Sequence, residues 1–272
     1  PPKLDRLKIR ILPEALPRVA EFVTGYLDIL EIPNAEYEMW LKDPEWKNHI
    51  QLINQLNTYY IGLNCSRPPF DNVLVRQAVN YAINVEEILS TIFSGRGQMA
   101  GGPIPPVLLE RIENPTFGYN PKKAKVLLKQ AGYTKRNNEG WLVQESTGKV
   151  LRFEIQIPKT YDYMVTPVQQ MMMEYGIDMQ IKFVDYNTMI KNVNERNFTV
   201  AYLQYAGAFF PNPEVEIHSS LADKNDNNNT TGFKNKQVDE LIAEYKTCFY
   251  QKKRFEIIRE IDGIFNEVHP KS

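Results

Sequence analysis

Cysteine and histidine are scarce in this 272-residue chain, which has two cysteines and three histidines. Two cysteines are too few for a disulfide framework, and neither Cys65 nor Cys248 has a neighbouring histidine that would make it a nucleophile. We therefore expect both to be buried free thiols. His49, His218 and His269 have no second ligand three or four positions away, so we expect no metal site.

Net charge is almost absent as well, because 32 basic residues are balanced by 33 acidic ones. This balance gives no electrostatic footprint for nucleic acid, and we expect no nucleic-acid partner. No apolar run approaches the roughly 20 residues that span a bilayer, and no signal-peptide pattern is present. The chain begins in a strand-like segment without methionine and stops after a helical pattern, so we expect a fragment or a processed form.

Motifs for cofactors and catalysis are also missing. Residues 95–100, GRGQMA, match the spacing of a dinucleotide-binding turn. That turn needs a strand before it and a helix after it, whereas here a helical pattern precedes and prolines follow. No G-x-S-x-G elbow and no Walker loop occur. We expect no cofactor and no catalytic residues, and an α/β enzyme with an unidentified site stays open as an alternative.

The first part of the chain contains alternating strand and helix patterns. Residues 4–12 alternate apolar and charged side chains, a helical pattern closes at Gly25, and residues 26–32 are strand-like again. This order predicts a strand–helix–strand unit, followed by a helical connection over 34–56.

Helix signals are clearest after the apolar strand expected at 58–64. Asn84, followed three residues later by Glu87, predicts the start of a helix. Another helix is expected at 119–133, ending at Gly132. Apolar residues that recur every four positions predict one further helix face: Val75, Val79 and Ile83.

The second half of the chain continues the same alternation. Residues 223–232 are the one low-complexity stretch, and we expect them to form a surface loop. We expect the methionine triplet 171–173 to pack in the core. The predicted elements are, in order, a hairpin over 140–157, a helix over 164–176, a strand over 177–185, a helix over 186–195, a strand over 198–205 and two helices over 236–268.

Four segments in this order resemble one known family. They are YYIGLNCSRPPFDNVLVRQAVNYAINVEEIL, GGPIPP, FGYNPKKAKVLLKQAGY and NNTTGFKNKQVDELIAEY. Together they resemble family 5 of the extracellular solute-binding proteins, which serve ABC importers for oligopeptides, dipeptides and nickel. The resemblance implies an α/β fold: a lobe of the periplasmic-binding-protein type II kind, with a mixed sheet flanked by helices.

The same resemblance implies a division of the chain. Residues 1–57 are expected to be the end of a first lobe and the approach to a hinge, residues 58–268 a second ligand-binding lobe, and residues 269–272 a truncated tail. The rest of the first lobe and a signal peptide would lie outside the sequence, and a lipid anchor in a longer form is left open.

The resemblance also implies a function without catalysis. The expected role is to capture an oligopeptide-like solute between two lobes by hinge closure and to deliver it to ABC permease subunits. We expect a monomer, peripheral to the membrane, in the periplasm or at the extracytoplasmic cell surface. An oligosaccharide or another non-peptide solute stays open as an alternative.

Two loops are the candidate binding segments. In peptide-binding members of the family, an Asp in the second loop meets the α-ammonium of the ligand, but Phe209 occupies the corresponding position when the prolines are aligned. Glu214 or Glu216 could replace that charge, and Phe209 and Phe210 could instead pack beneath the loop. The candidate ligand-binding residues are Gly101, Gly102 and Pro103 in the first loop, and Tyr205, Ala206, Gly207, Ala208, Phe209, Phe210 and Asn212 in the second.

Overall fold

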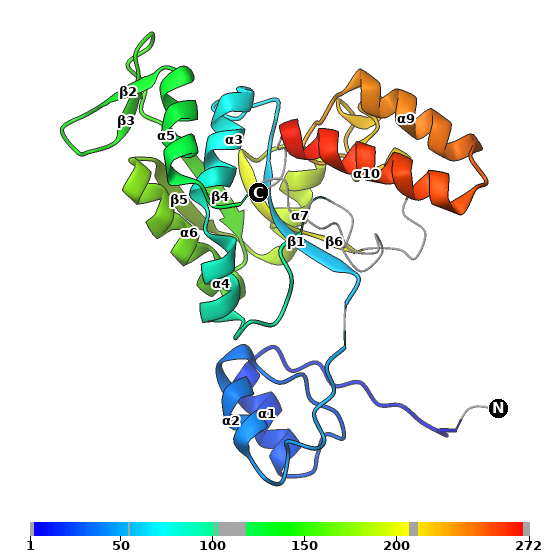
Figure 1. Cartoon of the computed structure of the whole chain (residues 1–272). Helices are drawn as coiled ribbons and strands as arrows, with labels where there is room; N and C mark the ends of the chain where they lie inside the picture. The colour runs from blue at the N-terminus through cyan, green and yellow to red at the C-terminus, as the bar shows by residue number, and fades with distance from the viewer. Residues whose placement is uncertain (1–2, 54, 101, 103–117, 207–211, 269–272) are drawn as a thin grey trace.

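A four-stranded mixed sheet is the centre of the computed structural model, which describes residues 3–53, 55–100, 102, 118–206 and 212–268 (Figure 1). The strand order is β1-β6-β4-β5. The central strand β4 runs parallel to β5 and β6, and β1 runs antiparallel to β6. The strands are β1 (Asn57–Leu63), β4 (Arg152–Ile157), β5 (Asp178–Phe183) and β6 (Val200–Ala206). This arrangement is the mixed sheet that the family resemblance implies.

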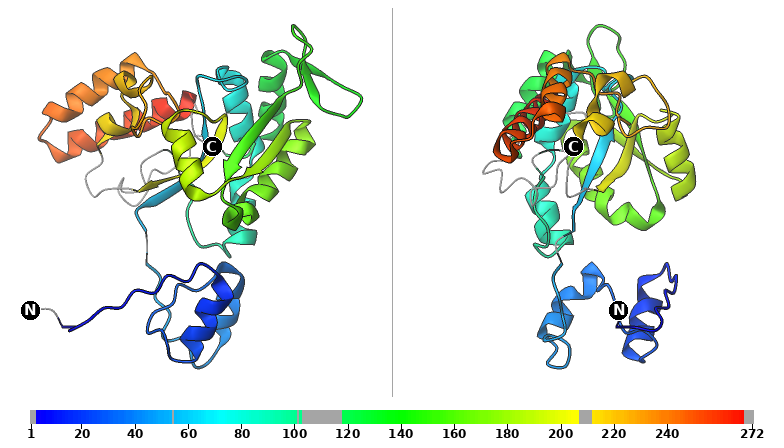
Figure 2. Two further views of the ribbon diagram at one scale, coloured as in Figure 1. Left: turned by 180° about the vertical axis from the view of Figure 1, so that it is seen from behind. Right: turned by 90° about the vertical axis from the view of Figure 1, so that its right-hand side faces the viewer.

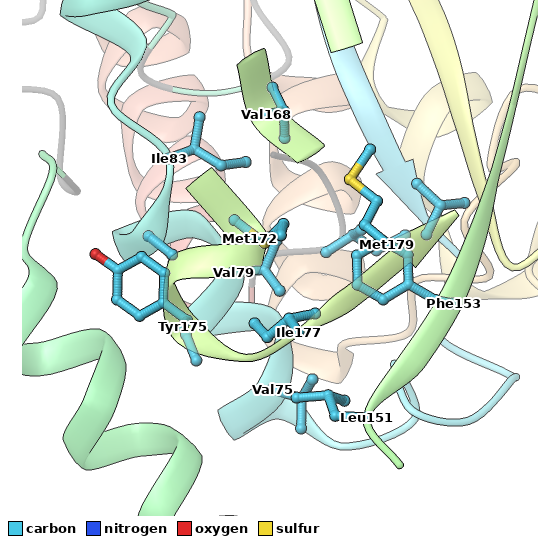
Figure 3. Close-up of a cluster of buried hydrophobic side chains, with 14 of the residues drawn as sticks. Val75, Val79, Ile83, Leu151, Phe153, Val168, Met172, Tyr175, Ile177 and Met179 are labelled. Carbon is cyan, nitrogen blue, oxygen red and sulfur yellow. The ribbon is translucent and has the colours of Figure 1, made fainter. Parts of the chain in front are cut away.

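Helices cover both faces of the sheet. One face packs against α3 (Val73–Ala82), α5 (Pro121–Gln130) and α6 (Asp162–Tyr175), and α4 (Val85–Ile92) lies against α6. The other face packs against α7 (Tyr186–Asn194). Figure 3 shows how side chains from α3 and α6 meet those of the strands in the larger core. Met172 is fully buried there, while Met173 is half exposed, so only part of the methionine triplet packs in the core.

Local capping explains why the helices begin where the sequence predicts. The side chain of Asn84 accepts a hydrogen bond from the backbone N–H of Glu87, and its amide donates to the Glu87 carboxylate. Asn120 caps α5 through the N–H of Lys123. Gly132 ends this region with a φ of +87°, a conformation that favours glycine.

A hairpin over 140–157 was predicted, and only the part next to its turn forms. Val143 and Val150 form an antiparallel bridge, and the N–H groups of Gln144 and Leu151 donate to the carbonyls of Lys149 and Leu142. Beyond this bridge β3 (Leu142–Gln144) pairs with β2 (Tyr133–Arg136). Residues 152–157 enter the main sheet as β4, where most of their side chains are buried. A strand buried on both faces suits the centre of a parallel ladder better than a hairpin edge.

A helical hairpin ends the described chain. It consists of α9 (Lys236–Thr247) and α10 (Gln251–Val268), with α8 (Pro213–Ile217) and a short 3-10 helix η4 (Ser219–Leu221) before it. Residues 223–232 are partly buried rather than a simple surface loop, since Asn229 and Thr231 are almost fully covered. No helix among the described residues is both long and apolar enough to cross a bilayer.

Residues 3–53, which we call the N-terminal unit, lie beyond the start of β1 (Figure 1). They contain α1 (Ala15–Val23), a 3-10 helix η1 (Asn34–Glu36) and α2 (Tyr37–Lys42). The rings of Phe22, Trp40 and Trp46 pack together with centroids 5.2–5.7 Å apart.

The strands predicted within the N-terminal unit do not form. Segments 4–12 and 26–32 have no strand partner among the described residues. Leu7, Ile9 and Ile11 are 73% to 90% exposed. The alternating pattern is therefore present, but a strand also needs a neighbour for its backbone hydrogen bonds.

Candidate functional site

One edge of the sheet collects the ends of all four strands. The parallel strands β4, β5 and β6 end there at Ile157, Phe183 and Ala206, and the antiparallel strand β1 begins there at Asn57, opposite Ala206. Ligands of open α/β sheets bind outside the carboxyl ends of the strands. Figure 2 shows the N-terminal unit below this edge in both views, so the edge lies between two parts of the chain.

A shallow hollow opens between the segments that leave β4 and β5. Its volume is about 480 Å³, and Pro158 and Phe183 are among its lining residues. The Lys159 Nζ atom lies 4.1 Å from the centroid of the Phe183 ring and 2.7 Å from a carboxylate oxygen of Asp162. Asp185 in the same hollow caps α7. The charged groups of this hollow are thus engaged by other residues of the protein. The surface left for a ligand is mainly the Phe183 ring and backbone atoms.

Four tyrosines from four elements gather beside the start of β1, and we call them the tyrosine cluster: Tyr59 of β1, Tyr202 of β6, Tyr161 of the 3-10 helix η3 (Lys159–Tyr161) and Tyr163 of α6. The rings of Tyr59 and Tyr202 are stacked with centroids 6.0 Å apart, and the Tyr161 ring lies 5.4 Å from that of Tyr202. Tyr59 is 49% exposed and Tyr163 is 41% exposed, whereas Tyr202 is buried. The cluster therefore has a buried centre and an open aromatic surface.

The hydroxyls of Tyr59, Tyr163 and Tyr202 remain protonated well above neutral pH. Burial raises the pKa of Tyr202 far above that of a free tyrosine, and the neighbouring tyrosines raise it further. Burial also raises the pKa values of Tyr59 and Tyr163, as do nearby tyrosines and then the carboxylate of Glu31. These hydroxyls can therefore donate hydrogen bonds to a ligand.

The hydroxyl of Tyr202 is buried and has no hydrogen-bond partner among the described residues. An unpaired buried hydroxyl costs about 1–3 kcal/mol. We expect Tyr202→Phe to raise the free energy of unfolding of the ligand-free protein by about 1 kcal/mol, measured by urea denaturation. Tyr59→Phe, in which the altered ring is half exposed, is the control and should change it by less than about 0.5 kcal/mol. A loss of stability in Tyr202→Phe would show that the hydroxyl is paired in solution.

Arg96, just after α4, joins the lobe to the N-terminal unit. Its guanidinium donates a hydrogen bond to the side-chain oxygen of Asn34 and lies 3.9 Å from the centroid of the Tyr37 ring. A cation over an aromatic face adds about 0.5–2 kcal/mol. This contact fixes η1 and α2 beside α4. It lies on the same side of the lobe as the sheet edge where β4, β5 and β6 end, which we call the candidate edge.

The residues predicted as ligand-binding are only partly placed. Tyr205 and Ala206 end β6 at the candidate edge, where they pair with Thr58 and Asn57. Gly102 lies against α10, because a Cβ atom added there would overlap the carboxylate of Asp262. No described contact joins Gly102 to the strand edge. Gly101, Pro103 and the segment from Gly207 through Ala208 and Phe209 to Phe210 lie outside the described residues.

Residues after the second loop serve the protein's own structure. Asn212 caps α8 by accepting a hydrogen bond from the N–H of Glu214. Glu214 forms an ion pair with Lys246 at 2.8 Å, and Glu216 accepts a hydrogen bond from Asn228. The two carboxylates considered as replacements for the missing Asp are thus already engaged.

The tyrosine cluster was missed in the sequence because each of its members has an ordinary local role. Tyr59 belongs to an apolar strand and Tyr161 precedes a helix, so the sequence indicates only that each side chain packs against its neighbours. One signal was available, since the alternation of β1 and β6 places Tyr59 and Tyr202 on the same face near one strand edge. Among the described residues, no three His, Cys, Asp or Glu side chains are grouped as a metal site would need.

Residues 1–228 match the family described as bacterial extracellular solute-binding proteins, family 5. The chain belongs to this family. Its fold and its extracytoplasmic location are therefore as the sequence predicts. The chain is 29% identical to heme-binding protein A of Haemophilus influenzae and 27% identical to the oligopeptide-binding protein AppA of Bacillus subtilis, in each case over 98% of its own length. It covers 48% and 49% of these proteins, so the chain spans about half the length of the curated relatives it matches.

Solved structures of binding proteins are also similar to this chain. AppA of Bacillus subtilis in complex with a nonapeptide has a TM-score of 0.83 at 25% identity, over 96% of this chain and 52% of that one. The ABC transporter-associated periplasmic binding protein DppA of Helicobacter pylori, in complex with the peptide STSA, has a TM-score of 0.79 at 23% identity, over 96% of this chain and 49% of that one. The second likeness concerns the fold alone. These relatives are named for what they bind and not for a reaction.

Proposed function

We propose that this chain supplies one side of a cleft that captures a peptide and presents it to the permease subunits of an ABC importer. The observation that carries the proposal is the open aromatic surface of the tyrosine cluster at the carboxyl edge of the sheet. Half-exposed Tyr59 and Tyr163 offer ring faces and hydroxyls, which suit a ligand with both apolar side chains and backbone polar groups. Membership of the family and the similarity to AppA support a peptide over other solutes.

The proposal assigns a role to each part of the chain. Residues 1–57 belong to the opposing lobe and the approach to the hinge, residues 58–268 form the binding lobe, and residues 269–272 begin a tail. The contact of Arg96 with Asn34 and Tyr37 supports this assignment, because it joins the two parts beside the candidate edge. The receptor acts as a monomer, performs no chemical step and closes by hinge motion around its ligand.

Binding to the full-length protein that carries this sequence tests the proposal. The protein is mixed with tri- to nonapeptides, the retained species are identified by native mass spectrometry, and their binding is measured by calorimetry. We expect saturable 1:1 binding, and a ligand at about 100 times its Kd should add roughly 2.7 kcal/mol to the free energy of unfolding. A parallel set of maltose oligomers separates the two solute classes. Binding of the sugars alone, or of neither class, would contradict the proposal.

A further inference from the structure

The short turn between α9 and α10 exposes two adjacent aromatic side chains. Phe249 is 92% exposed and Tyr250 is 82% exposed, and no other large apolar side chain that the structure describes is more exposed than Phe249. The helices on either side bury other apolar residues, including Tyr245 of α9 and Ile258 of α10, in one shared cluster. The two exposed rings therefore contribute little to the core of the hairpin. Figures 1 and 2 show this turn, residues 248–250, projecting away from the sheet.

Hydrogen bonds fix the backbone of the 248–250 turn. The guanidinium of Arg254 donates to the carbonyls of Tyr245 and Cys248 at 3.1 and 3.0 Å, and it lies 3.8 Å from the centroid of the Tyr245 ring. The backbone N–H of Arg254 donates to the carbonyl of Tyr250 at 3.0 Å. Because the turn is already ordered, the contact of its two rings with a partner costs little further backbone entropy.

Basic side chains flank the two rings. Residues 246–254 contain three lysines, one arginine and no acidic residue. Two of the lysines pair with glutamates of neighbouring elements, Lys246 with Glu214 at 2.8 Å and Lys253 with Glu244 at 3.4 Å, and both lysines are about half exposed. Lys252 is exposed and forms no ion pair with a residue that the structure describes. The turn thus offers an anionic partner one unpaired ammonium group and two more that are exposed.

An aromatic pair beside lysines has the composition of a contact with a membrane surface. Aromatic rings lie at the level of the headgroups, with a tyrosine hydroxyl toward water, and lysine ammonium groups are attracted to anionic lipids. From this geometry we propose that the 248–250 turn docks on anionic phospholipid headgroups at the extracytoplasmic membrane surface. A lipid layer is favoured over an acidic protein, because two rings on a projecting turn can enter it without a matching pocket. The inference goes beyond the proposed function and does not depend on the solute.

Sedimentation with lipid vesicles tests this inference. The full-length protein that carries this sequence, prepared without lipid modification, is mixed with vesicles of equal parts phosphatidylglycerol and phosphatidylcholine, or of phosphatidylcholine alone. We expect binding to the anionic vesicles, weakened at least about tenfold when Phe249→Ser and Tyr250→Ser are combined. Lys252→Ala should weaken it about fivefold. Phe249→Trp should keep the affinity of the wild type, since an indole ring also favours the headgroup level.

Two controls for the vesicle experiment lie on α5. Val126→Ser removes a half-exposed apolar side chain, and Lys125→Ala removes an exposed lysine without an ion pair among the described residues. Each should leave vesicle binding within about twofold of the wild type. An equal loss in Lys125→Ala and Lys252→Ala would overturn the inference, because the attraction would then be spread over the whole surface.

Two further outcomes would also overturn the docking of the 248–250 turn on lipid. One is binding of the Phe249→Ser, Tyr250→Ser variant as tight as that of the wild type. The other is a wild type that binds neither kind of vesicle, which would leave the turn to an acidic protein partner. Urea denaturation of the double variant, with the same midpoint as the wild type, shows that lost binding does not come from unfolding.

Discussion

Replacing Arg196 with alanine is expected to lower the free energy of unfolding by at least about 3 kcal/mol. Arg196 donates hydrogen bonds to four backbone carbonyls, those of Leu221, Lys224, Asn229 and Thr230, at 2.8–3.0 Å. Its removal takes one donor from each of the four carbonyls. Those of Leu221 and Lys224 keep a hydrogen bond from the Asn227 side chain, and that of Asn229 keeps the N–H of Gly232. Urea denaturation followed by circular dichroism measures the loss.

Two further substitutions make the Arg196 experiment specific. Arg196→Lys keeps the charge but cannot reach four carbonyls with a single ammonium group, so it should lose most of the same stability. Lys191→Ala, on the exposed side of α7, should change the free energy of unfolding by no more than about 0.5 kcal/mol. A loss below about 1 kcal/mol in Arg196→Ala would mean that the segment 221–230 is held by other contacts.

Replacing Ile155 with alanine is the second large effect, with an expected loss of about 2–5 kcal/mol. Ile155 lies at the centre of β4, opposite Ile181 of β5 and Val200 of β6, and it is fully buried. Truncation therefore removes buried methyl groups and leaves a cavity that neighbouring strands cannot close. Thermal and urea unfolding of the purified variant measure the loss.

The controls for Ile155 separate packing from strand pairing. Ile155→Val removes one methylene group and should cost about 0.5–1.5 kcal/mol. Glu154→Ala alters the adjacent position of the same strand, where an ion pair with Lys182 at 3.1 Å is partly exposed, and should cost less than about 1 kcal/mol. If Ile155→Ala and Glu154→Ala cost the same, Ile155 cannot lie at the centre of the sheet.

The helices could be predicted because their signals are local. Asn84 and Glu87 form a capping pair within one turn, and Gly132 ends its region through its own backbone conformation. Strand pairing could not be predicted in the same way. β4 was assigned to a hairpin because its true neighbours, β5 and β6, lie about 26 and 45 residues further along the chain.

The candidate site was harder to predict than the fold, because its residues are not neighbours in sequence. Tyr59 and Tyr202 meet only after β1 has paired with β6. The loops proposed from the resemblance carry few polar side chains, and most of their residues lie outside the described chain.

The position of β1 makes the tyrosine cluster a spectroscopic probe of movement of the N-terminal unit. Among the described residues β1 is an edge strand, paired only with β6, and it is also the strand through which the chain enters the sheet at Asn57. Tyr59 lies two residues from that entry, and its ring is nearly parallel to that of Tyr202, at an interplanar angle of 8°. A rotation of the N-terminal unit therefore reaches this ring pair before it reaches any other part of the sheet. The proposed closure would therefore change the near-ultraviolet circular dichroism of the two rings, without an attached dye.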